Sequence, residues 1–254
     1  MDFSNRYILI FAAVLCLVCS LAVSTLAVGL KERQEINKVL DQRLNVLAVA
    51  GVIETGEKRT KEEVDELFES IKELVIDRKT GEVLLEGDAA SKVDPIKEAK
   101  DPALSEPTPS DHKRTQVSTL PDRLKVYEVG IEGKECWVIT VWGNGLWSTM
   151  YGYMALAPDL SEVVGITFYE HGETPGLGGE VDNPIWKGQW VGKRAYGDDG
   201  APLVTVVKPG MATDRSYQVD GMSGATITSN GVKWMVDLWL GPDGYGKFLQ
   251  GVQQ

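Results

Sequence analysis

The chain opens with a long apolar run. Residues 7–30 carry no charge and are almost all apolar, which is long enough for one helix to cross a membrane with some tilt. A cleaved signal peptide is the alternative, since Ala22 and Ala27 are small, but the run exceeds the apolar part of a usual signal peptide. Apolar positions continue at helical spacing to Leu47, so we expect the helix to extend out of the bilayer. We therefore predict a permanent anchor in contact with membrane lipid.

A second helical pattern starts after Thr60. Thr60 and Glu63 have the spacing of a capping box, in which each side chain bonds the backbone N–H of the other residue. The apolar face expected from there comprises Val64, Leu67, Phe68, Ile71, Leu74 and Val75. Residues 87–116 are polar and rich in proline, which predicts an irregular connector.

Alternating and β-branched segments follow the connector. They are bounded by Gly, Pro or Asp and predict strands over 124–129, 136–142, 151–157 and 163–169. Helical spacing returns at Val232, Met235, Val236, Trp239 and Leu240, and Gly241 with Pro242 ends it. Neither a βαβ alternation nor a dinucleotide-binding glycine fingerprint is present in the sequence. The expected class is α+β, with one N-terminal transmembrane helix and a soluble domain built on a mostly antiparallel sheet with flanking helices.

These patterns divide the chain into four parts. We expect a short N-terminal tail at 1–6, the transmembrane helix at 7–30, a helical lobe with the proline-rich connector at 31–116, and a compact domain at 117–254. The length suffices for one good core with a smaller lobe.

Charge and cysteine usage narrow the function classes. A formal net charge of -11 repels a polyanion, and no basic stripe offsets it, so nucleic acid is not an expected partner. Cys16 and Cys19 lie in the apolar run and leave Cys136 without an obvious partner, which gives no disulfide framework. Cys136 is expected to be a buried strand residue.

The segment 220–232 places a hydroxyl, that of Thr226, in a turn of small residues that opens the last helix. Free N–H groups and the positive end of the helix dipole favour an anion at such a terminus. Thr228 and Ser229 are suitable N-cap residues. Taken alone, the turn is equally explained as a tight connection packed closely by small side chains.

The run Asp-Gly-Met-Ser-Gly-Ala-Thr at 220–226 resembles the flavinylation motif, in which a flavin transferase joins FMN through its phosphate to the last threonine. Together with residues 143–148 and 171–180, the chain resembles the family of FMN-binding C subunits of sodium-translocating NADH:quinone oxidoreductases. The homologous G subunits of Rnf-type electron-transport complexes are the alternative, but residues 146–157 fit the sodium-pump family better.

The resemblance implies a covalent FMN on Thr226, with Asp220, Ser223, Gly224 and Ala225 contributing to transferase recognition. Asp220 is equally explained by an Asp-Gly turn. Other expected FMN contacts are Ser223, Gly224, Ala225, Thr228, Glu173, Thr174, Gly176, Leu177, Trp147 and Lys208. Among these, Leu177 and Trp147 can cover the ring, Thr228 and nearby amides can bind phosphate oxygens, and Lys208 is a possible counter-charge, although an ordinary exposed lysine explains it as well.

The resemblance also implies a carrier within an enzyme, with no catalytic side chain and no NADH site of its own. It would relay single electrons from an intramembrane iron–sulfur centre toward the FMN of the B subunit and then quinone, beside the A, B, D, E and F subunits. The soluble domain would lie on the periplasmic side of a bacterial inner membrane. The basic residues Lys31, Arg33 and Lys38 weakly favour the opposite orientation, and we adopt the orientation that the resemblance implies.

Three other functions compete. A hydrolase could use Ser223 and His171, but residues 221–225 do not give the Gly-x-Ser-x-Gly pattern. A zinc site could use His112 and His171, but they have no helical spacing and are better read as surface histidines. A structural anchor or binding module without a redox role is the third alternative.

Overall fold

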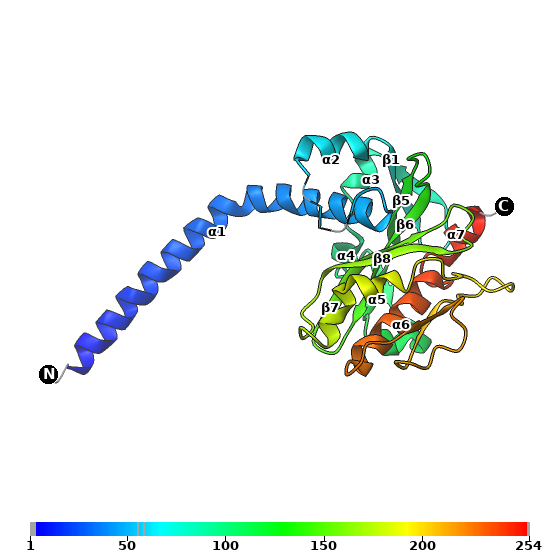
Figure 1. Ribbon diagram of the computed structural model, residues 1–254. Helices are drawn as coiled ribbons and strands as arrows, with labels where there is room; N and C mark the ends of the chain where they lie inside the picture. The colour runs from blue at the N-terminus through cyan, green and yellow to red at the C-terminus, as the bar shows by residue number, and fades with distance from the viewer. Residues whose placement is uncertain (1–3, 55, 58, 253–254) are drawn as a thin grey trace. The chain divides into compact units, whose positions relative to one another are not determined.

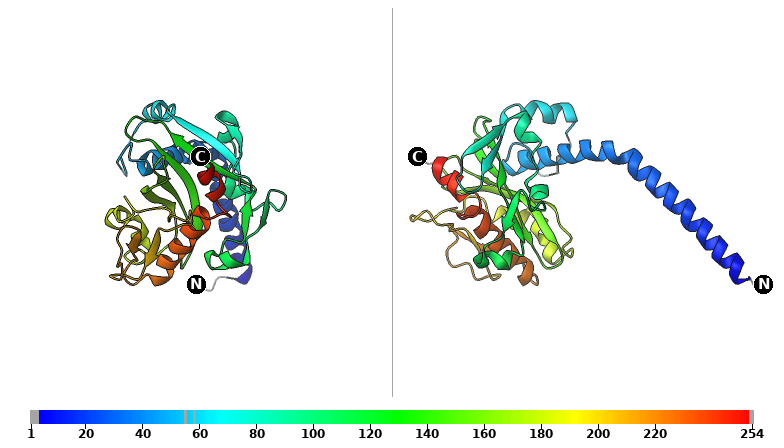
Figure 2. Two further views of the ribbon diagram at one scale, coloured as in Figure 1. Left: turned by 90° about the vertical axis from the view of Figure 1, so that its right-hand side faces the viewer. Right: turned by 180° about the vertical axis from the view of Figure 1, so that it is seen from behind.

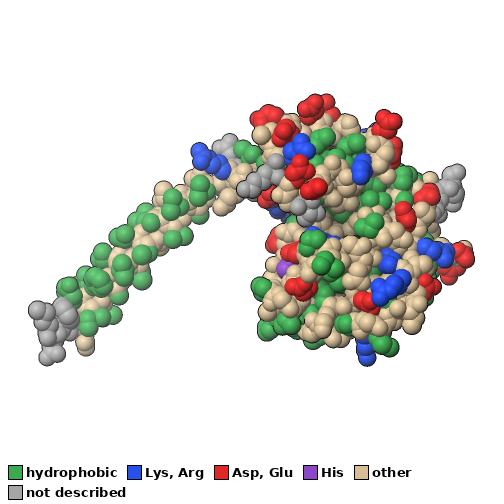
Figure 3. All heavy atoms as spheres, in the orientation of Figure 1, with side chains coloured by type: hydrophobic (Ala, Val, Ile, Leu, Met, Phe, Trp, Pro, Cys, Tyr) green, Lys and Arg blue, Asp and Glu red, His purple; other side chains and the backbone are tan. Residues whose placement is uncertain are grey.

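The computed structural model describes residues 4–54, 56, 57 and 59–252, in two compact units, Met1–Gln42 and Arg43–Gln254. From Asn5 onward, the first unit belongs to helix α1 (Asn5–Val49). Its apolar part, Asn5–Lys31, is long enough to cross a membrane, and the hydrophobic side chains along it are exposed (Figure 3). Exposing so many large apolar side chains to water is unfavourable, so this helix fits a membrane anchor.

The second unit is built on an antiparallel sheet of six strands in the order β2-β1-β5-β6-β7-β8 (Figure 1). The strands are β1 (Ile71–Asp77), β2 (Val83–Glu86), β5 (Arg123–Val129), β6 (Cys136–Asn144), β7 (Thr149–Leu156) and β8 (Val163–Glu170). The four strands predicted from β-branched and aromatic residues are confirmed as β5 to β8, and so is the α+β class. Cys136 is buried in β6, and burial raises the pKa of its thiol to about 12.

Helix α2 (Lys61–Phe68) begins with the predicted capping box. The Thr60 hydroxyl accepts the N–H of Glu63 (3.3 Å), and the Glu63 carboxylate accepts the N–H of Thr60 (2.8 Å). The predicted extension of this helix over 71–75 is wrong, because those residues form β1. The strand packs apolar side chains from both of its faces, so its run of buried residues fits helical spacing as well as strand spacing.

A buried ion pair joins β1 to β5. Lys125, only 7 % exposed, places its Nζ 3.2 Å from the carboxylate of Glu73 and also donates to the carbonyl of Ser91 (3.1 Å). Removing one partner of such a pair strands a buried charge, which costs about 3–5 kcal/mol.

The proline-rich connector contains short elements rather than a continuous irregular segment. They are α3 (Asp88–Ser91), α4 (Pro95–Glu98), β3 (Ser105–Pro107) and the 3₁₀ helix η1 (Ser110–Thr115). β3 pairs with β4 (Thr119–Pro121). Pro95 is the first residue of α4, where the missing N–H has no intrahelical partner to lose.

Helix α6 (Thr226–Leu240) packs against β6, as the views in Figure 2 show. The Trp239 ring lies 3.8 Å from that of Trp142 and donates from Nε1 to the Trp142 carbonyl (2.6 Å). Gly231 permits the close approach, since a Cβ there would lie 2.2 Å from the Asn144 carbonyl oxygen. The predicted helix and its end at Gly241 are confirmed.

The remaining elements precede α6 in the chain, except for α7 (Gly246–Val252), which follows its C-terminal end. A parallel pair, β9 (Thr205–Val207) and β10 (Gln218–Asp220), leads into α6. The other elements are the 3₁₀ helix η2 (Gly178–Asp182), α5 (Pro184–Gly188) and α7.

Candidate functional site

The N-terminus of α6 is open. Ala225 occupies the N-cap position, and within the described residues no side chain caps this helix and no acidic residue stands in its first turn. The first N–H groups of an α-helix have no intrahelical acceptor, so this end of α6 presents donors and a positive partial charge. Thr226 is the first helical residue and its side chain is exposed. An exposed hydroxyl therefore lies next to groups that favour an anion.

The predicted N-cap role of Thr228 and Ser229 is wrong, because the helix begins earlier, at Thr226. The Ser229 hydroxyl instead accepts the N–H of Met222 (2.9 Å) and holds the turn before the helix. Gly224 in this turn has φ 74°, a left-handed conformation that favours glycine. A Cβ at Gly224 would lie 3.1 Å from Cδ2 of Leu177, so the turn lies directly against the 174–177 loop.

Glu173 lies in the segment 171–180. Its carboxylate bonds residues of the other two predicted segments, 143–148 and 220–232. Oε2 accepts the Thr228 hydroxyl (2.6 Å) and the Leu146 N–H (3.1 Å), while Oε1 accepts the N–H groups of Trp147 (2.8 Å) and Ser148 (3.1 Å). Burial raises the pKa of this carboxyl, but the hydrogen bonds from Thr228 and from the three N–H groups outweigh burial and leave the pKa below its ordinary value. Glu173 is therefore ionised at neutral pH.

Two glycines give this carboxylate its room. A Cβ at Gly145 would lie 2.5 Å from Oε1 of Glu173, and one at Gly178 would lie 2.6 Å from Oε2. Gly145 and Gly178 thus permit the close packing around the Glu173 carboxylate.

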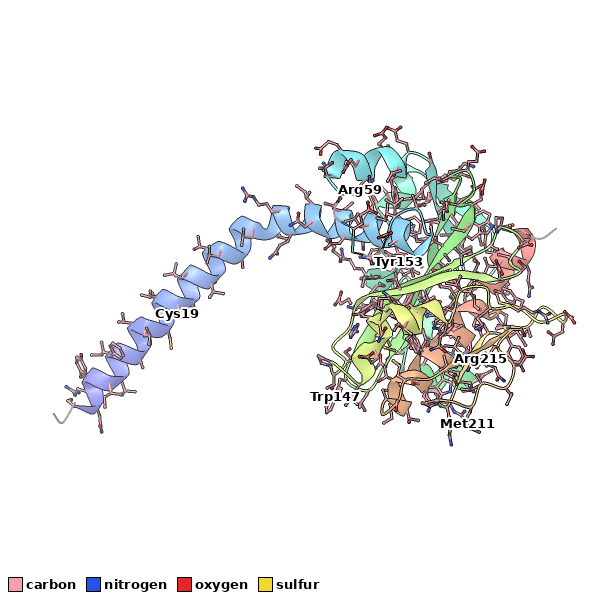
Figure 4. The ribbon with its side chains drawn as sticks, in the orientation of Figure 1. Cys19, Arg59, Trp147, Tyr153, Met211 and Arg215 are labelled. Atoms are coloured by element: carbon pink, nitrogen blue, oxygen red, sulfur yellow. The ribbon has the colours of Figure 1, made fainter. Side chains whose placement is uncertain are left out.

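Trp147 and Leu177 are large apolar side chains on the two segments that Glu173 connects. Trp147 is 71 % exposed and Leu177 is 45 % exposed. Figure 4 shows Trp147 projecting from the edge of the domain. Thr174 is exposed, and its carbonyl accepts the N–H groups of Leu177 (3.1 Å) and Gly179 (2.9 Å), while Gly176 has φ 76°. The loop is thus a defined turn that presents Leu177 outward.

Asp220 and Lys208 stand at the ends of the parallel strands. The Asp220 carboxylate accepts the N–H of Ala212 and pairs with Arg215, both at 3.1 Å, so it fixes the preceding loop. Lys208 is exposed directly after β9, and the adjoining Val207 carbonyl accepts the N–H of Gly221 (2.8 Å). The fold therefore brings the segment of Lys208 beside the turn before Thr226.

Comparison with known proteins identifies the family. A family model described as the FMN-binding domain matches residues 145–241. The chain is 45 % identical over 242 residues to the C subunit of Na(+)-translocating NADH-quinone reductase from Vibrio anguillarum, covering 94 % of this chain and 91 % of the relative. The same subunit of Pseudomonas aeruginosa is 43 % identical over 258 residues, covering 99 % and 97 %. The chain belongs to the family of Na(+)-translocating NADH-quinone reductase C subunits.

Solved structures agree with this family. The crystal structure of NqrC from Shewanella oneidensis superposes with a TM-score of 0.74 at 32 % identity, covering 84 % of this chain and 96 % of that one. The C subunit from Parabacteroides distasonis gives a TM-score of 0.67 at 28 % identity, covering 87 % and 96 %. As a C subunit, the protein is a flavoprotein of an oxidoreductase complex and carries an FMN-binding domain.

The residues around Thr226 fit FMN. The open start of α6 suits a phosphate, and Trp147 and Leu177 offer apolar surfaces for a flavin ring. The side chains of Glu173 and Thr228 bond each other and are buried, so their predicted contact with FMN stays a prediction. The matched region begins at residue 145, and it includes every predicted FMN-contact residue.

The structure does not place His171 as a base for Ser223, the pair that the hydrolase alternative needs. Nδ1 of His171 accepts the N–H of Glu173 (3.2 Å), and its Nε2 lies 2.7 Å from Asp182. Since an N–H can only donate, Nδ1 is the acceptor and Nε2 carries the proton in the neutral ring. Both nitrogens are thus occupied by groups other than Ser223. His112, the other histidine, pairs with Asp243 at 3.3 Å.

Proposed function

We propose that this C subunit carries FMN as a phosphoester on Thr226. Oγ1 of Thr226 attacks the FMN phosphorus of a flavin-dinucleotide donor. The new O–P bond replaces the P–O bond to the nucleotide leaving group, which departs as a nucleoside monophosphate with the hydroxyl proton, so the chain gains the mass of FMN less one water. The observation that carries the proposal is the exposed Thr226 at a helix start that Ala225 leaves uncapped. A flavin transferase needs access to this hydroxyl, and Ser223 and Gly224 beside it are exposed as well.

The side chains of the site have distinct proposed roles. The N–H groups of the first turn of α6 hold the phosphate oxygens, and Lys208 supplies a nearby positive charge. Trp147 and Leu177 cover the flavin ring, while Thr174 and the backbone at Gly176 offer polar groups to its edge. Asp220 holds the turn that the transferase must recognise.

The proposed activity is electron relay. FMN supplies one-electron transfer from an intramembrane iron–sulfur centre toward the FMN of the B subunit and on to quinone. The chain's own part is to hold the ring at an exposed edge of the domain, and to fix the domain to the membrane through α1. We place α1 in a bacterial inner membrane with the domain on the periplasmic side, beside the A, B, D, E and F subunits.

Mass and fluorescence of the denatured protein test the linkage. Co-expression with an active flavin transferase should give one FMN less one water, and peptide mapping should place it on Thr226. Thr226→Ala should remove all flavin fluorescence from the denatured band, and Thr226→Ser should retain part of it. Thr213→Ala is the matched control, because Thr213 is an exposed threonine of the preceding loop. Fluorescence that survives denaturation in Thr226→Ala would refute the assignment.

A further inference from the structure

Within the part of the chain that the structure describes, the side chain of Glu173 contacts both the Trp147 loop and the first turn of α6. Three of its partners are consecutive backbone N–H groups, at residues 146–148, and the fourth is the hydroxyl of Thr228. Thr228 lies two residues beyond Thr226, and Leu177 lies four residues beyond Glu173 in the same loop. The carboxylate therefore joins the ring-covering residues to the attachment residue.

The environment of Glu173 suits a brace better than a ligand for FMN. The residue is 5 % exposed, and both of its oxygens are already shared between two donors each. Three of the four partners are backbone N–H groups, which can only donate, and an ionised carboxylate offers acceptor sites on both oxygens for them and for the Thr228 hydroxyl. Consecutive N–H groups of this kind form an anion-binding nest, which here holds a side chain of the protein itself.

We infer that Glu173 is a positioning residue, which sets the place of Trp147 relative to Thr226 through its ionised carboxylate. The inference rests on the proposed function, because Trp147 and Thr226 matter together only if FMN spans them. It assigns Glu173 to the chain's internal bracing and not to contact with the cofactor. It also explains Gly145 and Gly178, where any side chain would collide with the carboxylate.

Glu173→Gln tests the inference with little change of shape. A glutamine amide replaces one oxygen by an NH₂ group, and each oxygen of Glu173 has at least one backbone N–H partner, which can only donate, so at least one of these N–H groups must separate. In protein made without the transferase, we expect the N–H groups of residues 146–148 to exchange with solvent about tenfold faster. Glu170→Gln is the control, because it removes the same charge from an exposed side chain three residues earlier. It should leave this exchange unchanged.

Flavin fluorescence of the loaded protein gives the second measurement. Tryptophan in contact with a flavin quenches its emission, so Trp147→Phe defines the yield without that contact. The yield of Glu173→Gln should rise toward that of Trp147→Phe, while that of Glu170→Gln should match the unmodified sequence. Urea unfolding shows whether Glu173→Gln loses stability in general. A general loss of stability would not by itself bring the flavin yield to that of Trp147→Phe.

Thr228→Val distinguishes the bond from Glu173 to Thr228 from its bonds to the N–H groups of residues 146–148. It removes one donor and nearly preserves shape, so it should slow flavin attachment at Thr226 while leaving the exchange of residues 146–148 protected. If Glu173→Gln does not fold, Thr228→Val tests the bond to α6, and Ser148→Pro tests the bonds to residues 146–148, since it removes one N–H together with the hydroxyl that accepts the Gly172 N–H. Unchanged exchange and unchanged flavin yield in Glu173→Gln would overturn the inference.

Failure of the inference is distinct from failure of the attachment proposal. The exchange measurement uses protein without flavin, so it reports on the brace even if Thr226 is not the attachment site. The mass of the unmodified sequence, loaded by the transferase, reports on Thr226 alone.

Discussion

The starts of α2 and α6 differ in how they treat the backbone N–H groups that have no partner within the helix. At α2, Thr60 and Glu63 satisfy two of the backbone N–H groups that every helix start leaves without partners. At α6, Ala225 offers no side-chain oxygen, and Thr226 stands exposed. The capped start of α2 stabilises its helix, whereas the uncapped start of α6 leaves the donors that we propose for the phosphate of FMN. A missing cap on a well-packed helix is thus informative about function.

The uncapped start of α6 relies on the packing of the rest of the helix for stability. Of the changes considered, we expect Gly231→Ala to disrupt this packing most strongly. Alanine normally favours a helix over glycine by about 1 kcal/mol. Here its Cβ would meet the Asn144 carbonyl at 2.2 Å, so overpacking should win and lower the free energy of unfolding by about 3 kcal/mol. Urea unfolding measures it. Gly188→Ala in α5 is the control, since its Cβ would meet no atom within 4 Å, and it should not destabilise.

Each helix start also has a carboxylate, and acid should weaken both. The folded pKa of Glu173 lies below its ordinary value of 4.5, so its contribution to stability is present above that value and is lost as pH falls through the folded pKa. The pKa of Glu63 is lowered chiefly by its bond from the Thr60 N–H, with the same sign. Unfolding free energies of Glu173→Gln and the unmodified sequence should differ most at neutral pH and converge in acid. A constant difference from neutral pH down through the folded pKa would contradict this account.

Removing the cap of α2 should lower the stability of the protein without changing its content of covalent flavin. Thr60→Ala removes the cap of α2 and should lower the free energy of unfolding by about 1 kcal/mol. Thr60→Ser keeps the hydroxyl and should lose less. Flavin content after denaturation should match that of the unmodified sequence in both, and a drop in Thr60→Ala alone would undermine the contrast between the two helices.

The smallest stability effect is expected at the open helix. Thr226→Ala removes an exposed side chain that caps nothing, so protein without flavin should unfold within about 0.5 kcal/mol of the unmodified sequence. The same change should abolish covalent flavin. A large destabilisation would mean that Thr226 has a structural role that the exposed position does not indicate.

Local patterns predicted the parts of the fold that local chemistry determines. Strands β5 to β8, the capping box of α2 and the end of α6 at Gly241 all follow from residue types within a few positions. β1 was mistaken for helix because a strand buried on both faces lacks strict alternation. Its pairing with β2 is local, but its pairing with β5, which follows more than forty residues later, has no local signal.

The site divides in the same way. The motif around Thr226 could be recognised from sequence, and the exposed hydroxyl at the helix start agrees with it. The hydrogen bonds of the Glu173 carboxylate could not be predicted from the sequence, because their four donors lie 25 to 55 residues away along the chain. Only the folded chain distinguishes a carboxylate that braces a site from one that contacts its ligand.

The order of strands has a practical consequence for anyone preparing the soluble part. A protein beginning at residue 117 would lack β1 and β2 and expose β5 as a bare edge, where strands of separate molecules can pair and aggregate. It would also leave the ammonium group of Lys125 without the carboxylate of Glu73. A protein beginning at Arg43 retains both strands and omits the apolar run. We expect this form, and not the one beginning at residue 117, to remain monodisperse.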